Sequence, residues 1–317
     1  MQKIFVAGKL LEKTEEVLKQ MGATFWTGTG KISEEELKKG AKDAEAIICP
    51  LSAPITSDVL TASPKLKIVA NVGAGFDNID VQKAQELGIA VTNTPKVSTE
   101  STAELSFGLI LDVMRRVSEG DRLLRTHPEE FKGWAPTFFL GRELHGKTLG
   151  IIGLGQIGQA VAERAFAFGM KILYSGHHPK EVAQKWDARF VSQEELLEKS
   201  DIVSVHAAYS DELYHLFQKE TFQKMKKTAF LVNASRGKVI DEAALVEALE
   251  AKEIAGAALD VFEFEPHVNE SLTKFENVVL TPHIGNATVE TREQMGDMAV
   301  ANVKAVLAGD APIHSVY

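Results

Sequence analysis

Three side chains of different chemistry follow apolar runs in the second half of the chain: Arg236 in L-V-N-A-S-R-G, Glu265 in L-D-V-F-E-F-E-P and His283 in L-T-P-H-I-G. An arginine can hold a carboxylate through two hydrogen bonds. A histidine held by a carboxylate can deliver a proton near neutral pH. Singly, each residue has an ordinary structural interpretation, as a surface arginine, a capping glutamate or a core histidine. Their joint occurrence indicates substrate grip, a proton donor and a group that tunes it, which is what hydride transfer to a carbonyl needs.

These residues must be positioned by apolar strands that alternate with amphipathic helices. Alternation of this kind predicts βαβ units and parallel sheets, whose ligands bind beyond the carboxyl ends of the strands. A smaller α/β unit comes first, and a larger unit with six strand-like runs, enough for a full nucleotide-binding sheet, follows it. Residues 102–125 are expected to form one long helix that joins the two. The runs are 3–7, 44–49, 66–72 and 89–93 in the first unit, and 147–153, 171–174, 201–206, 229–234, 256–261 and 277–282 in the second.

The stretch G-L-G-Q-I-G, residues 153–158, follows one of these apolar runs and opens a helical stretch. Gly153 would make the tight turn, Gly155 would let the backbone approach a pyrophosphate, and Gly158 would let helix and strand pack closely. The pyrophosphate would then lie at the N-terminus of the helix, where free N–H groups favour an anion. The alternative is a glycine turn in a sheet that binds nothing, and the strand and helix on its two sides argue against it.

The stretch K-I-L-Y-S-G-H-H-P, residues 171–179, is expected to be a strand that runs into a loop. An NAD site usually has an acid here for the ribose hydroxyls, whereas an NADP site lacks it because the acid would repel the 2′-phosphate. Ser175 can donate to a phosphate oxygen, and His177, His178 and Lys180 can add donors or charge. We therefore expect NADP(H), with NAD(H) use left open. The alternative is a polar surface loop.

The bulk composition is that of a globular protein, with 317 residues, 44% apolar and 25% charged, enough for two domains. A net charge of −9 without a long basic block argues against nucleic acid as a partner. No apolar run has the length of a membrane span, and the N-terminus is interpreted as a strand and not as a signal peptide. The lone Cys49 fits a reducing compartment and is expected to be a small buried side chain. A cytoplasmic location is the expectation.

The chain resembles the D-isomer-specific 2-hydroxyacid dehydrogenases along nearly its full length. The resemblance is carried by six ordered stretches: V-G-A-G-F-D-N-I-D (72–80), V-T-N-T-P (91–95), G-I-I-G-L-G-Q-I-G (150–158), L-V-N-A-S-R-G (231–237), A-L-D-V-F-E-F-E-P (258–266) and T-P-H-I-G (281–285). It implies that Arg236, Glu265 and His283 are catalytic. It implies that Val72, Gly73, Ala74 and Gly75 bind the substrate carboxylate through backbone amides, and that Asp260 bonds the nicotinamide amide. The other implied cofactor positions are Thr102, Gly153, Gly155, Gln156, Ile157, Gly158, Ser175, His177, His178, His206, Ala207, Ala234 and Gly285. No metal is expected.

The resemblance also implies an arrangement of two doubly wound parallel-sheet domains, flavodoxin-like and Rossmann, with the active site in the cleft between them. The substrate domain would be 1–98 with 286–317, because the helix near 290–308 returns to it, and the cofactor domain would be 99–285. Members are usually dimers through the segment near 100–145. The aromatic stretch 131–140 fits such a surface, unless these aromatics pack within their own subunit.

Within the family, the glyoxylate/hydroxypyruvate reductases are most similar, because Y-S-G at 174–176 resembles a loop that goes with NADPH. The implied activity is reduction of a small 2-keto acid to the D-2-hydroxy acid. H-A-A-Y-S at 206–210 departs from the pattern of many relatives, which weakens the assignments beside the adenosine. The alternatives are a nucleotide-sensing binding protein of the same fold without significant turnover, a dehydrogenase for a bulkier 2-keto acid, or an enzyme acting on another anion such as phosphite.

Overall fold

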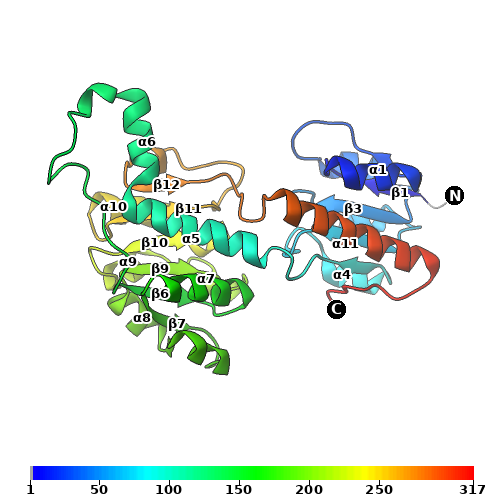
Figure 1. The fold of residues 1–317 in the computed structure, drawn as a ribbon. Coiled ribbons are helices and arrows are strands. Elements are labelled where there is room, and N and C mark those ends of the chain that lie inside the picture. Colours follow the sequence, from blue (N-terminus) through cyan, green and yellow to red (C-terminus); the bar gives the residue numbers. More distant parts are fainter. Residues whose placement is uncertain (1–2) are drawn as a thin grey trace. The chain divides into compact units, whose positions relative to one another are not determined.

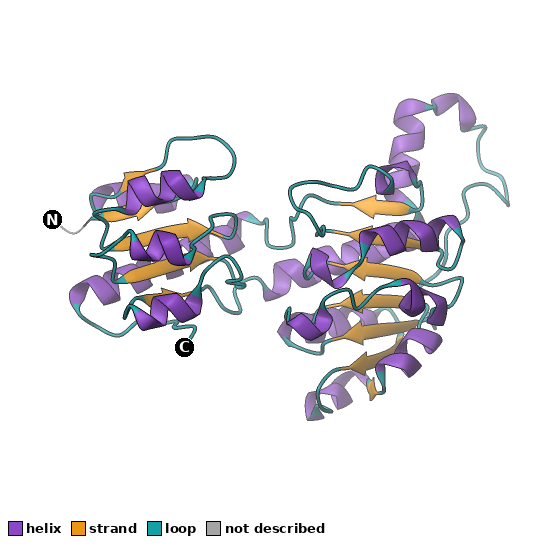
Figure 2. Cartoon of the chain, turned by 180° about the vertical axis from the view of Figure 1, so that it is seen from behind, coloured by secondary structure: helices purple, strands orange, loops and turns teal. Residues whose placement is uncertain are grey.

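The structure is a computed structural model that describes residues 3–317, and its chain divides into two compact units. One unit contains Met1–Ser98 with Asn286–Tyr317, and the other contains Thr99–Gly285. Both units are built on parallel sheets with helices on both faces (Figures 1 and 2). The fold class predicted from the alternating pattern is confirmed.

The first unit has a five-stranded sheet in the order β2-β1-β3-β4-β5. Its strands are β1 (Ile4–Val6), β2 (Thr24–Phe25), β3 (Ala46–Pro50), β4 (Ile68–Val72) and β5 (Ala90–Thr92). Its helices are α1 (Glu12–Gln20), α2 (Glu34–Ala41), α3 (Ser57–Thr61), α4 (Val81–Glu86) and α11 (Val289–Ala308). Buried side chains of α2, α3 and α4 pack on one face of the sheet, and those of α1 and α11 pack on the other. Helix α11 thus returns from the far end of the chain to cover β3, β4 and β5.

The second unit has a seven-stranded sheet in the order β12-β11-β10-β9-β6-β7-β8. Its strands are β6 (Thr148–Ile152), β7 (Lys171–Ser175), β8 (Arg189–Phe190), β9 (Ile202–Val205), β10 (Phe230–Asn233), β11 (Gly256–Leu259) and β12 (Val278–Leu280). The six predicted runs are all strands, and the short edge strand β8 was not predicted. This strand has only two residues, Arg189 and Phe190, which are too few to form an apolar run.

Helices cover both faces of this larger sheet. Helices α5 (Thr99–Arg115) and α7 (Gln156–Ala167) lie on one face, and α8 (Gln193–Lys199), α9 (Lys219–Lys224) and α10 (Glu242–Glu250) lie on the other. The 3-10 turns are η1 (Pro128–Glu130), η2 (Glu181–Trp186), η3 (Asp211–Leu213), η4 (Gly237–Val239) and η5 (Leu272–Lys274). Strands buried on both faces explain why the predicted runs are almost uniformly apolar.

The prediction of one helix over residues 102–125 is wrong. The segment forms α5 and a second helix, α6 (Val117–Thr126), which are separated by Arg116 in the left-handed conformation with φ of 58°. The Arg116 guanidinium lies over the Phe139 ring at 4.0 Å and pairs with Glu119, which holds the turn. Helix α6 and the residues after it stand away from the sheet of their unit (Figure 1).

Candidate functional site

His283 and Glu265, predicted from separate motifs, lie together in the structure. The Nδ1 atom of His283 is 2.8 Å from Oε2 of Glu265. His283 follows strand β12 and Glu265 follows β11, so adjacent parallel strands bring them to the same edge of the sheet. Because Nδ1 faces the carboxylate, Nε2 is the ring nitrogen left to exchange a proton with a ligand.

The charge state of Glu265 suits this pairing. Burial alone would raise the pKa of Glu265, but hydrogen bonds from His283 and from the Phe262 N–H, with the nearby charges of His283 and Arg236, outweigh it and lower that pKa. Oε1 of Glu265 accepts the Phe262 N–H at 3.0 Å, which fixes the carboxylate on its own loop. Glu265 is therefore an anion at neutral pH.

The loop that carries His283 is held by Asp260. His283 has φ of 52°, a left-handed conformation that costs a non-glycine residue about 1–3 kcal/mol. The buried Asp260 carboxylate accepts the Thr281 hydroxyl at 2.7 Å and the backbone N–H groups of Ile284 and Gly285 at 2.8 Å each, and the Asp260 carbonyl accepts the His283 N–H. These bonds hold the histidine in its strained conformation. Oδ2 of Asp260 accepts only the Gly285 N–H among the described bonds, so it retains capacity for a nicotinamide amide.

Arg236 lies in the loop after strand β10, on the carboxyl side of the strand adjacent to β11. The buried Asn233 shapes this loop: its Nδ2 donates to the Arg236 carbonyl at 2.9 Å, and its Oδ1 accepts from the Ser235 N–H and hydroxyl. A Cβ at Gly237 would lie 1.9 Å from the Phe262 carbonyl oxygen, so this residue must be glycine. Sequence reasoning missed Asn233, although a polar residue at the end of an apolar strand is a usable signal.

The glycine loop is shaped by the space around its three glycines. Gly153 has φ of 91°, and a Cβ there would lie 2.5 Å from the Ala207 backbone nitrogen. A Cβ at Gly158 would lie 2.3 Å from the Gly153 carbonyl, so α7 packs tightly on its strand. At Gly155, in contrast, a Cβ would meet nothing within 4 Å. Gly155, Gln156 and the exposed N-terminus of α7 therefore present open space beside free N–H groups, which fits a pyrophosphate.

Ser175 is the last residue of β7, as predicted, and the bend after it carries the exposed His177 and His178. The Tyr174 hydroxyl accepts the Lys180 N–H at 2.8 Å, which closes this bend on its own strand. The Ser175 side chain is 5% exposed, so little of it faces open solvent.

The remaining predicted cofactor residues belong to the same unit as the glycine loop. His206 follows β9, and burial lowers its pKa to about 4, so it is neutral and its Nε2 lies 2.8 Å from the Ser204 hydroxyl. Thr102 lies beside Gly285, since a Cβ at Gly285 would be 3.4 Å from the Thr102 methyl. Ile157, in the first turn of α7, and Ala234, in the loop after β10, are half-buried.

The predicted carboxylate loop belongs to the first unit. Val72 ends strand β4, and Gly73, Ala74 and Gly75 follow it. The carbonyls of these three residues accept hydrogen bonds from the Thr94 N–H, the Asn93 amide and the Asn71 amide respectively. These donors were not singled out from the sequence.

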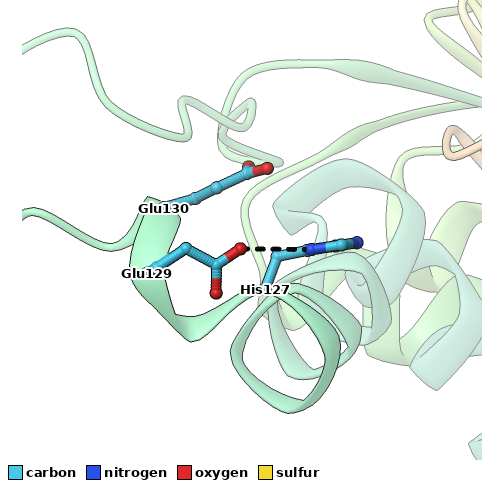
Figure 3. A group of neighbouring side chains, drawn as sticks. All are labelled: His127, Glu129 and Glu130. Atoms are coloured by element: carbon cyan, nitrogen blue, oxygen red, sulfur yellow. Dashed lines mark hydrogen bonds and ion pairs between the residues drawn. The ribbon is translucent and has the colours of Figure 1, made fainter.

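His127, which follows α6, and Glu129 and Glu130 of η1 form a separate cluster, with ligand atoms that all lie within 4.8 Å of one another (Figure 3). All three are exposed, and His127 Nδ1 is 3.3 Å from a Glu129 oxygen. Exposed groups of this kind are common without an ion, and nothing else near the cluster points to one.

The fold and the paired groups at the carboxyl edge of the larger sheet define a nicotinamide-dependent oxidoreductase. The family model for the NAD-binding domain of D-isomer specific 2-hydroxyacid dehydrogenases matches residues 107–285. A protein of Staphylococcus saprophyticus described as a 2-hydroxyacid dehydrogenase is 50% identical over 315 residues, which cover 98% of each chain. The chain belongs to the D-isomer-specific 2-hydroxyacid dehydrogenase family, and is a dehydrogenase that acts on CH–OH donors.

Solved structures agree with this assignment. A Thermus thermophilus protein has a TM-score of 0.94 at 39% identity, with full coverage of both chains. The NADPH-dependent glyoxylate/hydroxypyruvate reductase of Sinorhizobium meliloti, solved with NADP and malonate, has a TM-score of 0.89 at 33% identity, covering 99% of this chain and 96% of that one. In the described part of the chain, residues 3–317, no helix is both long and apolar enough to cross a membrane.

Proposed function

We propose that the protein reduces a small 2-keto acid, such as glyoxylate or hydroxypyruvate, to the D-2-hydroxy acid. The observation that carries this proposal is the His283–Glu265 pair at 2.8 Å, on adjacent strands and next to the strand that leads to Arg236. An anionic carboxylate behind a histidine is the arrangement that a proton donor for a carbonyl oxygen requires.

In this proposal the substrate carboxylate is held by the Arg236 guanidinium and by the backbone N–H groups of the 73–75 loop. A fixed carboxylate presents one face of the keto group, which is the origin of stereospecificity. The 153–158 loop and Asp260 would hold the nicotinamide cofactor, which would supply the hydride for the carbonyl carbon. His283 gives the proton on Nε2 to the carbonyl oxygen, and Glu265 orients the imidazole through its contact with Nδ1.

We also propose NADP(H) as the preferred cofactor, with NAD(H) as a second one. No acid occupies the end of β7, and Ser175 can donate a hydrogen bond to a 2′-phosphate. His177, His178 and Lys180 add donors on the exposed bend. The S. meliloti reductase, whose title gives NADPH dependence, is a solved relative at 33% identity.

A homodimer is the proposed assembly, formed through the segment that stands away from the sheet. Its apolar side chains are exposed in the single chain, with Trp134 at 88%, Leu140 at 63% and Phe131 at 52%. Such exposure supports a contact with a second subunit over packing within the same subunit alone. Large exposed apolar patches usually mark protein–protein contacts.

The test is the initial rate of reduction of glyoxylate, hydroxypyruvate and bulkier 2-keto acids, each with NADPH and with NADH. Fast reduction of the two small acids with NADPH supports the proposal. Turnover confined to bulkier acids would show that the substrate is a larger 2-keto acid. No turnover with any keto acid would overturn the reductase proposal and favour a nucleotide-sensing role.

A further inference from the structure

The backbone carbonyls of residues 73–75, in the loop after strand β4, all accept hydrogen bonds from other parts of the same unit. The Gly73 carbonyl accepts the Thr94 N–H at 2.9 Å, the Ala74 carbonyl accepts the Asn93 side-chain amide at 2.7 Å, and the Gly75 carbonyl accepts the Asn71 side-chain amide at 2.7 Å. Three consecutive carbonyls of a surface loop are thus held by donors of the protein itself.

This pattern fixes the direction of the amide N–H groups. In a trans peptide, the carbonyl of one residue and the N–H of the next point in opposite directions. The N–H groups of Ala74, Gly75 and Phe76 therefore point away from Thr94, Asn93 and Asn71. Within residues 3–317, none of these N–H groups donates a hydrogen bond. The loop is left with a set of donors that face away from the protein's own acceptors, which is the arrangement of an anion-binding nest.

The asparagine at position 71 is itself held in place. Asn71 is 1% exposed in the middle of the unit, and its Oδ1 lies 3.4 Å from the Asn78 side-chain nitrogen and 3.6 Å from the Cys49 sulfur. The Asn78 amide also donates to the Ala53 carbonyl at 2.9 Å. A buried amide without hydrogen-bond partners destabilises the fold. The hydrogen bonds of this network therefore hold the Asn71 side chain in one orientation.

We propose that Asn71 and Asn93 are positioning residues that build the carboxylate receptor of the 73–75 loop. The proposal rests on the proposed function of that loop and adds the residues that create its polarity. Neither side chain touches the substrate. Each acts by holding a carbonyl back, so that the opposite N–H faces the ligand and needs no reorganisation on binding.

The test uses the full-length enzyme with the neutral, similarly sized substitutions Asn71→Leu and Asn93→Leu. These remove the amide donor without adding a charge that would itself repel an anion. We expect the KM for glyoxylate and the inhibition constant of malonate to rise about 10-fold in each variant, since a loop carbonyl loses its hydrogen bond and the opposite backbone N–H is no longer held toward the ligand. The kcat should stay within about 2-fold and the Kd for NADPH should not change, because the cofactor residues belong to the other unit.

Ser63→Ala is the matched control. Ser63 is a buried polar residue of the same unit, and its hydroxyl donates to the Val59 carbonyl of α3, not to the loop. The control should leave KM and malonate inhibition unchanged while it reports the effect of losing a buried hydrogen bond. Asn93 is only half-buried, so Asn93→Leu keeps the test open if Asn71→Leu fails to fold.

The outcomes separate this inference from the proposed function. Unchanged KM and malonate inhibition in a folded Asn93→Leu enzyme, or a loss of kcat alone, would overturn the positioning role. If the wild-type protein reduces no keto acid, calorimetric titration of malonate still measures the receptor. Malonate binding that weakens in the variants would then support the receptor while the reductase proposal falls, and no malonate binding would overturn both.

Discussion

The two loops proposed to hold anions are built by different means. The 153–158 loop depends on the absence of side chains. A Cβ added at Gly153 or Gly158 would lie 2.5 or 2.3 Å, respectively, from a backbone atom of a neighbouring residue. The 73–75 loop differs at Gly73, where the three atoms nearest to an added Cβ all belong to the Leu51 side chain and not to the backbone. Its geometry comes instead from donors on Asn71 and Asn93 that hold its carbonyls.

The difference shows two ways to aim backbone N–H groups at an anion. The first uses steric exclusion and a helix N-terminus, so that the glycines themselves are required. The second uses side chains behind the loop. The loop residues are then less constrained than the asparagines that hold their carbonyls. Substitutions in the two loops should therefore have unequal effects.

Among substitutions in the two loops, the largest effect is expected for Gly153→Ala. Its φ of 91° and the backbone of Ala207 leave no room for a methyl group, so both the loop and NADPH binding should suffer, with affinity reduced about 10- to 100-fold. Gly155→Ala is the matched variant, because its φ of −76° is ordinary and its Cβ would enter open space.

Thermal unfolding of the free protein and NADPH titration distinguish these two variants. Gly153→Ala should lower the unfolding midpoint, whereas Gly155→Ala should leave it unchanged and still weaken NADPH. Normal NADPH binding by Gly155→Ala would mean that no pyrophosphate approaches this backbone.

A second, selective effect is expected for Ser175→Asp. A carboxylate at the end of β7 would repel a 2′-phosphate and could accept from ribose hydroxyls, so kcat/KM with NADPH should fall about 10-fold or more while that with NADH is kept. Steady-state kinetics with both cofactors measure the ratio, and Ser175→Ala controls for loss of the hydroxyl. An unchanged ratio in Ser175→Asp would contradict the proposed phosphate contact.

A smaller effect is expected for Gly73→Ala. The Leu51 side chain can move aside, and Gly73 is not among the glycines with positive φ. The KM for glyoxylate should therefore rise only a few-fold, which corresponds to a loss of about 1 kcal/mol or less in binding free energy. A loss as large as that of Gly153→Ala would show that the two loops are constrained alike, and would remove the contrast drawn between them.

The smallest effect near neutral pH is expected for His206, which follows β9 and adjoins Ala207. Burial lowers its pKa to about 4, so the folded protein keeps it neutral while the unfolded chain takes up a proton below about pH 6.5. Its contribution to stability is present above that pH and is lost as the pH falls toward 4.

The variant His206→Gln should therefore flatten the fall in unfolding midpoint between about pH 6.5 and 4. Thermal unfolding across that range measures it. If the unfolding midpoints of the wild type and the variant fall in parallel as the pH is lowered, His206 does not titrate in this way.

The sequence predicted what depends on strongly constrained residues. Apolar runs predicted all the interior strands, because strands buried on both faces must be apolar, and the glycine motif predicted the turn at Gly153. The joint occurrence of Glu265 and His283 predicted a pair that the structure places in contact. Cys49 is buried, as expected.

What could not be predicted depends on contacts distant in the sequence or on weak local signals. Strand β8 is only two residues long, and both are exposed. The break between α5 and α6 requires Arg116 in the left-handed conformation, which no local sequence pattern predicts. The bonds of Asn71 and Asn93 join segments that only the folded sheet brings together. The Asp260 clamp on the His283 loop is of the same kind.

The measurement that tests the account most directly is the comparison of His283→Gln with the wild type, in kcat for glyoxylate reduction and in NADPH binding by fluorescence titration. Loss of the proton donor should lower kcat by about 10²- to 10⁴-fold, while the Kd for NADPH stays the same. Near-normal kcat in a variant that binds NADPH would contradict the role of His283 and, with it, the proposed chemistry of the site.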